Sequence, residues 1–451
     1  MNNNSHLGTQ SIPKLMFNLA LPAVVSQVVN MLYSIIDRMY IGHIADVGID
    51  SLTGIGLCAP IIMIVSAFSY LFGTGGAPKA AIEMGKGNTK QAEKILGNCT
   101  FALILSSIFL MLVLVVFGKD LLYLFGASDV TITYAYDYLK IYSFGTIFVQ
   151  LTLGLNTFIT TQGFAKYSMF TIMIGAITNI ILDPIFIYVL NMGVQGAALA
   201  TTISQCLSAI WVFKFLTGKK TILKIKKENL VLKKSIILPV VALGLSPFIM
   251  SATESLLNIC FNVSLQKYGG DIAVGAMTIL SSIMMLCLMP LTGISQGCQP
   301  IISFNYGAKN MDRVKSAFKI QLLICVFYSC TFWLVIMLIP EMIISIFNSD
   351  AELLSMTTWA LRIYGFGLFA LGVQLACQQT FVALGQAKIS LLLACLRKII
   401  LLIPLIFLLP VFFENNTFAV FLSEPIADIL AATITGITFM VTSKKLFNNT
   451  L

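Results

Sequence analysis

Long apolar stretches follow one another along the whole chain, separated by short polar segments. A stretch of about 20 apolar residues can cross a hydrocarbon core of about 30 Å as one α-helix. The stretches are continuous and do not alternate as the strands of a membrane β-barrel do. The pattern therefore predicts an all-α integral membrane protein with twelve transmembrane helices, near residues 13–41, 51–72, 95–117, 137–161, 168–190, 196–217, 236–266, 274–297, 318–340, 357–383, 391–411 and 418–442.

The composition and the placement of charge support this class. Hydrophobic residues make up 58% of the 451 residues, charged residues make up 10%, and the mean hydropathy is +0.91. Such a chain is too apolar for a soluble domain. The net charge of +9 could suggest a nucleic-acid partner, but 21 of the 28 basic residues fall on one side of the predicted membrane. By the positive-inside rule that side is the cytoplasm. We expect a bacterial inner-membrane protein with both termini cytoplasmic and no nucleic-acid partner.

An internal repeat divides the predicted helices into two sets. Residues 139–145 are similar to residues 361–367 at an offset of 222, and the same offset relates Gly163 to Gly385. Since 222 residues hold six helices, the two sets run parallel and are related by an axis along the membrane normal. This architecture is typical of carriers, although duplication also builds channels and receptors. We expect an N-terminal lobe at 1–222, a C-terminal lobe at 223–451 and a cytoplasmic linker at about 218–234.

The chain lacks the motifs that would supply energy from ATP or catalyse a reaction. The Gly-Lys pairs at 85–86 and 218–219 are not followed by the Ser or Thr that a P-loop requires, so an ion gradient has to supply the energy. The short loops contain no GxSxG or HExxH motif. Two histidines and ten scattered cysteines without a CxxC pair indicate neither a metal centre nor a disulfide. We expect a carrier and not an enzyme, with no cofactor besides the coupling ion.

An acidic side chain in the first predicted helix is the first candidate for function, because a charge inside a bilayer is costly. Tyr33 and Asp37 are four residues apart and share a helix face, with Asn30 close by on the same side. Pro22 removes a helical hydrogen bond and offers a hinge. Alternatively, Asp37 pairs with Arg38 near the membrane boundary, but adjacent helical residues point in different directions.

A second acid lies in the fifth predicted helix. Asn179 and Asp183 are one turn apart, and Pro184 cannot donate to the carbonyl of Ile180, so three oxygens become available there. Hard monovalent cations prefer oxygen ligands, and a buried acid can equally carry a proton. The pattern does not choose between Na⁺ and H⁺. The alternative is a polar contact between helices.

The seventh predicted helix carries a polar stripe that includes Glu254 and, one turn later, Asn258. The stripe either lines a substrate cavity or fills the core of the second lobe. Arg397 and Lys398 lie early in the eleventh predicted helix, where we expect them to be cytoplasmic anchors.

Five short segments follow one another in order along the chain: Leu21-Pro22, Asp37-Arg38 followed by Ile41-Gly42-His43, Asn179 with Asp183-Pro184, Gly193-Val194-Gln195-Gly196-Ala197-Ala198, and Gly297-Cys298-Gln299-Pro300. Taken together they resemble the MATE (multidrug and toxic compound extrusion) family over essentially the whole chain, and the Asn179/Asp183-Pro184 element is most similar to its DinF/MepA-like bacterial branch. The resemblance implies a V-shaped fold of twelve helices and antiport of drug-like cations against Na⁺ or H⁺.

The resemblance also implies roles for individual residues. The cation site of the family maps onto Asp37, Asn179, Asp183 and Thr201, and its nearby cavity onto Tyr33, Asn30 and Asn156. Glu254 matches the helix 7 glutamate of the NorM-like branch. That branch has an aspartate in helix 10, where this chain offers only Gln374, Gln378 and Gln379.

The nearest rival is a lipid-linked oligosaccharide flippase of the same superfamily fold. Such a flippase should present cationic side chains to hold a pyrophosphate. The expected cavity residues here are acidic or polar and uncharged, which favours cationic small molecules as substrates. We expect the protein to work in the bilayer as a monomer, with a cavity lined by Asn30, Tyr33, Asn156, Glu254 and Asn258.

Overall fold

The computed structural model describes residues 5–44, 48–347 and 351–448, and this part of the chain is helical with no strand. The prediction of an all-α protein is confirmed. The helices of the first half are α1 (Ser5–Thr9), α2 (Ile12–Gly42), α3 (Gly48–Gly85), α4 (Thr89–Leu124), α5 (Thr131–Thr161), α6 (Ala165–Pro184) and α7 (Gly193–Thr217). Those of the second half are α8 (Lys234–Gly307), α9 (Met311–Leu338), α10 (Pro340–Ile344), α11 (Ala351–Tyr364), α12 (Leu368–Ala383), α13 (Ala387–Cys395), α14 (Ile403–Phe412) and α15 (Asn416–Asn448).

Twelve membrane crossings follow from these helices. Eleven helical runs in the described residues are long and apolar enough to cross a bilayer. One of them, α8, has 74 residues and contains Gly270 with φ 64° and ψ −162°, a backbone conformation open essentially to glycine alone. The chain turns back there, so α8 supplies two crossings. The predicted number of transmembrane helices is therefore confirmed.

The internal repeat is visible in the turns between helices. Gly163 before α6 and Gly385 before α13 both have a left-handed backbone, with φ of 90° and 72°. At another pair of turns, Gly87 (φ 78°) corresponds to Lys309 (φ 58°) at the same offset of 222. A non-glycine residue rarely adopts this conformation. Equal backbone geometry at matched positions indicates that the turns of the two halves are built alike.

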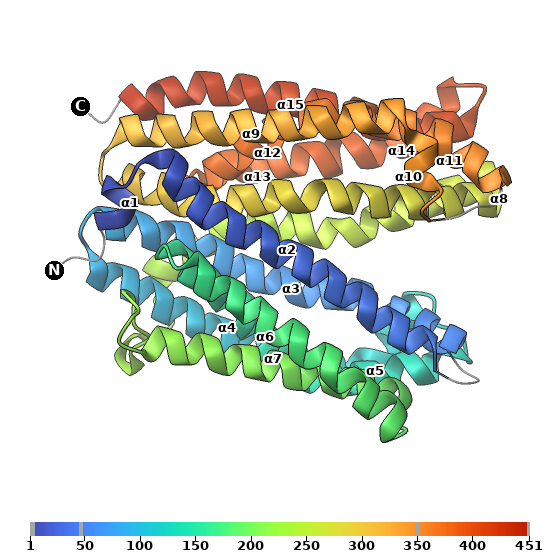
Figure 1. Cartoon of the computed structure of the whole chain (residues 1–451), viewed down its shortest axis with the longest axis horizontal. Helices are drawn as coiled ribbons and strands as arrows, with labels where there is room; N and C mark the ends of the chain where they lie inside the picture. The colour runs from blue at the N-terminus through green and yellow to red at the C-terminus, as the bar shows by residue number, and fades with distance from the viewer. Residues whose placement is uncertain (1–4, 45–47, 348–350, 449–451) are drawn as a thin grey trace.

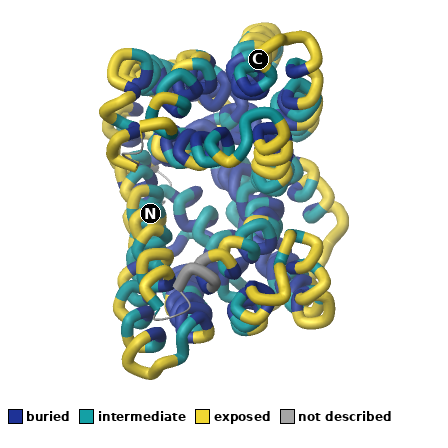
Figure 2. Tube along the Cα trace, turned by 90° about the vertical axis from the view of Figure 1, so that its right-hand side faces the viewer, coloured by how far each residue is buried: buried dark blue, intermediate teal, exposed yellow. Residues whose placement is uncertain are grey.

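Buried side chains form separate clusters in the two halves and a shared cluster between them. One cluster lies within residues 41–198 and a second within residues 257–427. A third joins both halves and contains Leu7, Leu223 and Ile302. In Figure 1, both termini lie at the left end, with the first half below and the second half above. An end-on view shows exposed residues around the outside and buried residues between the helices (Figure 2).

Small residues bring the halves together. A Cβ atom added at Gly244 in α8 would collide with the backbone oxygen of Leu71 in α3, and one at Gly297 would collide with Ala20 in α2. Glycine at such positions lets membrane helices approach closely enough for their backbones to touch. Helix α2 thereby packs on α8 near Pro22, while it also packs against α6. Helix α2 thus contacts the second half near Pro22 and carries Asp37 of the candidate site further along.

Candidate functional site

Four helices of the first half, α2, α5, α6 and α7, bring polar side chains to one buried place. Asn179 and Asp183 of α6 are 0% exposed, and Thr201 of α7 is 4% exposed. The amide nitrogen of Asn179 lies 3.2 Å from the hydroxyl of Thr201 and 3.4 Å from a carboxylate oxygen of Asp183. With the amide turned over, its nitrogen donates to Asp183 at 2.8 Å and its oxygen accepts from the hydroxyl of Thr201 at 3.2 Å. That orientation satisfies the Asn179 donor and acceptor together.

Helix α2 adds an acid and a phenol to this group. The carboxyl group of Asp37 lies close enough to that of Asp183 to interact with it directly, and Tyr33 lies close to both acids and to Thr201. One carboxylate oxygen of Asp37, Oδ1, is buried and has no hydrogen-bond partner among the described residues. Leaving a buried polar atom unpaired costs free energy. This oxygen could therefore accept a proton or contact a cation.

The repulsion between Asp37 and Asp183 also favours binding of a proton or a cation at this place. Two ionised carboxylates about 4 Å apart repel by about 4 kcal/mol at an effective dielectric constant of about 20. A proton on either acid, or a monovalent cation between them, removes this repulsion. The surrounding oxygens come from two carboxylates, an amide and a hydroxyl, which suit a hard cation such as Na⁺. No group of three His, Cys, Asp or Glu side chains that could hold a metal ion occurs in the part of the chain that the structure describes.

Two tyrosines of α5 were missed by the sequence analysis. Tyr138 and Tyr142 are 4% and 3% exposed, and their rings stack with centroids 6.1 Å apart. Tyr138 lies within electrostatic range of Asp37, and both tyrosines lie within that range of Tyr33. They close the α5 side of the site. A signal for Tyr142 was present, because it lies in the repeated segment at 139–145.

The local backbone places the Asp183 side chain. Helix α6 ends at Pro184 and continues into the π-helical turn η1 (Ile185–Val189). Proline has no N–H to donate, so the regular helical ladder is interrupted here. Single π-helical turns inside α-helices are frequent at functional sites.

Apart from Tyr33, the predicted cavity residues lie outside this group. Asn30 is exposed on α2. Asn156 is half-buried, and its amide donates to the carbonyl of Ser168 at 3.3 Å. Glu254 and Asn258 belong to α8 in the second half, where Asn258 is exposed and Glu254 is ion-paired with Lys398. Their contact with substrate stays a prediction.

Pro22 is buried inside α2, which continues as a helix through it. The hydroxyl of Ser26 donates to the carbonyl of Pro22 at 2.8 Å, one turn further along. The proline thus lies where α2 packs on α8, about four turns before Asp37. Its role as a hinge stays a prediction.

The expectation that Arg397 and Lys398 are cytoplasmic anchors is wrong. Both lie in the π-helical turn η4 (Leu396–Leu402), in the middle of the run from α13 to α14. Lys398 is 5% exposed and donates to the carbonyl of Met250 at 2.7 Å. The basic side chains stay inside because acids of other helices neutralise them. These acids include Glu424 and Asp428 of α15, which the sequence analysis missed although an acid inside an apolar helix is itself a signal.

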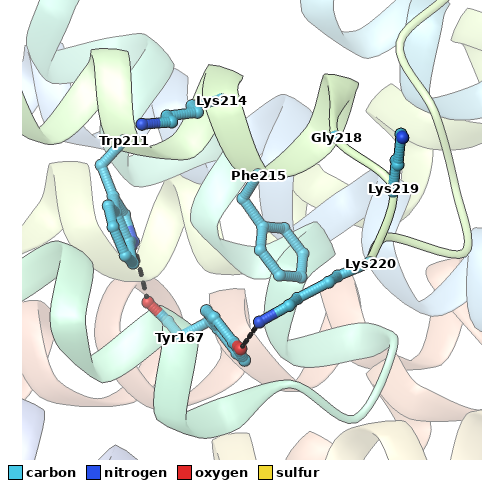
Figure 3. Close-up of a pocket in the computed structure, with 7 residues that line it drawn as sticks. All are labelled: Tyr167, Trp211, Lys214, Phe215, Gly218, Lys219 and Lys220. Carbon is cyan, nitrogen blue, oxygen red and sulfur yellow. Dashed lines mark hydrogen bonds between the residues drawn. The ribbon is translucent and has the colours of Figure 1, made fainter.

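A cavity of about 320 Å³ lies away from these acids, at the end of α7 near the termini. Figure 3 shows its residues, Tyr167, Trp211, Lys214, Phe215, Gly218, Lys219 and Lys220. The ammonium of Lys220 donates to the hydroxyl of Tyr167 at 3.1 Å, and the indole of Trp211 donates to its carbonyl at 3.3 Å. Its three lysines make this cavity unsuited to a cationic ligand.

Comparison with known proteins agrees with the architecture. The family model described as MatE matches residues 22–185 and 247–408. The multidrug export protein MepA of Staphylococcus haemolyticus (strain JCSC1435) is 24% identical over 399 residues, which cover 88% of this chain and 87% of MepA. A crystal structure of a MATE in the bent conformation superimposes with a TM-score of 0.93 at 20% identity, covering 100% of this chain and 99% of that one.

A second solved structure has a more similar sequence. The MATE multidrug transporter DinF-BH, solved as a complex, is 32% identical with a TM-score of 0.90, and the alignment covers 98% of each chain. The matched family segments include both the α2–α6 region and its counterpart in the second half. Because the family model covers well over half of the residues, this chain belongs to the multidrug and toxic compound extrusion (MATE) family and is a multi-pass membrane transporter.

Proposed function

We propose that the protein is a multidrug efflux antiporter that exports cationic, amphipathic compounds in exchange for H⁺ or Na⁺. The observation that carries the proposal is the contact between Asp37 and Asp183, with a buried Asp37 oxygen left unpaired. The names of MepA, a multidrug export protein, and of DinF-BH, a multidrug transporter, support export of drug-like compounds. The buried acids support a cationic substrate and a proton or Na⁺ as the coupling ion.

Coupling follows from the repulsion between the two acids. With both ionised, Asp37 and Asp183 favour separation of α2 from α6. A proton or Na⁺ removes the repulsion and favours their approach. Helix α2 can change shape at Pro22, where one backbone hydrogen bond is absent. Because α2 also carries Tyr33 and Asn30, its movement would reshape the substrate cavity. Ion and substrate would then compete through two conformations of one helix, whereas direct competition for Asp37 would need no bending.

The proposed orientation places both termini and the linker at 218–234 in the cytoplasm of a bacterium. The linker is attached to the first half. Gln162 accepts from the backbone N–H groups of Ile222 and Leu223 at 2.7 and 2.8 Å, and Glu93 pairs with Lys226 at 2.5 Å. This hydrogen bond raises the pKa of Lys226. The two lobes, 1–222 and 223–451, would rock about the site within a single monomer.

Transport by the purified protein in proteoliposomes tests the proposed function. A cationic dye loaded into the proteoliposomes should be expelled against its gradient when an inward H⁺ gradient or an inward Na⁺ gradient is imposed, each tested separately. The effective ion identifies the coupling. Movement of a lipid-linked oligosaccharide without movement of dye would overturn the proposal in favour of a flippase.

A further inference from the structure

Five ionisable side chains lie together inside the membrane-spanning part of the second half, and the proposed coupling at Asp37 does not use them. They come from three elements in the upper group of helices in Figure 1: Glu254 of α8, Arg397 and Lys398 of η4, and Glu424 and Asp428 of α15. Arg397 donates to Asp428 at 2.7 Å and to Glu424 at 3.0 Å. Lys398 pairs with Glu254.

The charges of this cluster do not balance. Three carboxyl groups face two basic groups, so full ionisation would leave one excess negative charge in a low-dielectric interior, which is costly. Asp428 and Glu424 share the single guanidinium of Arg397. Glu424 is 9% exposed, and its second oxygen, Oε2, is buried with no hydrogen-bond partner among the described residues. Glu424 is therefore the acid whose negative charge is least neutralised by its neighbours.

The position in the fold matches the first site. The offset of 222 relates Tyr142, which lies near Tyr33 of the first site, to Tyr364, which lies within electrostatic range of Glu424, Asp428, Arg397 and Glu254. The same offset relates Thr201 in α7 to Ser423 in α15, the neighbour of Glu424. It also relates α6 to the run from α13 to α14. Each half thus places a buried tyrosine of the repeated segment beside its own buried acids.

We propose that Glu424 is a second proton-binding site of the transporter, which gains and loses one proton on Oε2 during the transport cycle. In one direction the Glu424 carboxylate binds one H⁺ and becomes a neutral carboxyl group, and in the other direction it releases that H⁺. The Oε1 atom stays bonded to Arg397 in both states. This site does not depend on the coupling proposed for Asp37.

A proton fits this place better than Na⁺ does. Na⁺ needs several oxygen ligands, whereas Glu424 offers one unpaired oxygen and has the positive charges of Arg397 and Lys398 near it. Among the described residues, Tyr364 and Cys287 are two further titratable groups within electrostatic range of the cluster. Glu254, with 45% of its side chain exposed, is the most accessible acid of the cluster.

Infrared difference spectroscopy on the purified transporter tests the proposal, because a protonated carboxyl group has its own C=O stretch. The double variant Asp37→Asn/Asp183→Asn removes the acids of the first site. Titration of that protein should still show one buried carboxyl band that appears as the pH falls. Adding Glu424→Gln should abolish the band, while adding the exposed-site change Glu341→Gln should leave it in place. Adding Glu254→Gln removes the excess negative charge of the cluster and should move the band to lower pH.

Two results would overturn the proposal. One is the absence of any such band in the Asp37→Asn/Asp183→Asn protein, which can be measured even if the Glu424 variant fails to fold. The other is a band that persists after Glu424→Gln, because the proton would then belong to another acid. Neither result bears on whether Asp37 couples transport.

Discussion

Replacing Asp183 with Asn removes one of the two carboxyl groups in contact at the candidate site while keeping its size and one hydrogen-bonding oxygen. The protein should fold and insert at least as well as the natural one. An aspartate at the centre of a membrane helix costs about 2.5–3.5 kcal/mol to insert by translocon scales, and the amide avoids most of that cost. Ion binding, in contrast, should weaken strongly.

The size of the loss follows from the contact. If the repulsion that an ion relieves is about 4 kcal/mol, then removing it lowers the affinity of Asp37 for the coupling ion about 1,000-fold, at about 1.4 kcal/mol for each factor of ten. Asp37→Asn should have a similar effect. The double variant should be little worse than either single one, because both changes remove the same interaction.

Dye transport in proteoliposomes, measured over a series of H⁺ or Na⁺ concentrations, gives the ion dependence. For Asp183→Asn the half-saturating concentration should move beyond the accessible range, while the melting temperature stays equal to or above that of the natural protein. Asp120→Asn, at an exposed acid, is the matched control and should change neither quantity. An Asp183→Asn protein whose ion dependence stays within threefold of the natural protein would refute the assignment.

Four further predictions concern the neighbours of the site, the packing, the hinge and the topology. Thr201→Val removes the hydroxyl beside Asn179 and Tyr33 and should weaken ion binding about tenfold, since a buried hydrogen bond contributes about 1–2 kcal/mol; Thr201→Ser should restore it. Gly244→Ala forces a methyl group against the Leu71 backbone and should lower the free energy of unfolding by about 1–3 kcal/mol, which a lower melting temperature would show. Gly56→Ala is the matched control: its methyl group meets no atom within 4 Å, so the melting temperature should not change. Pro22→Ala should slow dye transport and leave ion affinity unchanged, and full transport by this variant would favour direct competition at Asp37. A cysteine placed at exposed Lys227 should react with an impermeant thiol reagent only from the cytoplasmic side, and periplasmic labelling would contradict the topology.

Hydropathy predicts the crossings well and their ends poorly. The predicted helix at 95–117 corresponds to α4, which runs from Thr89 to Leu124. Hydropathy marks the part of a helix inside the bilayer, while caps decide where the helix begins. Here the side chain of Asn88 accepts from the backbone N–H of Gln91 and starts the helix well before the apolar run.

Some residues of the candidate sites could be predicted from the sequence and others could not. Asp37 and Asp183 stand out because ionisable residues are rare in apolar helices, and the structure brings them together. Thr201 has no such signal, and only the family resemblance indicated it. Arg397 and Lys398 were misplaced because a charge at the edge of an apolar run is usually an anchor. Their pairing with Glu424 and Asp428 joins helices that no local pattern relates.

Counterflow of ions tests the central claim most directly. Proteoliposomes are loaded with a cationic dye, no ion gradient is imposed, and the movement of H⁺ and Na⁺ is recorded as the dye leaves. An antiporter moves one of these ions inward as the dye moves outward, and Asp183→Asn should abolish this movement. Dye exit without counterflow, ion movement in the same direction as the dye, or undiminished counterflow in Asp183→Asn would each contradict coupling through Asp37 and Asp183.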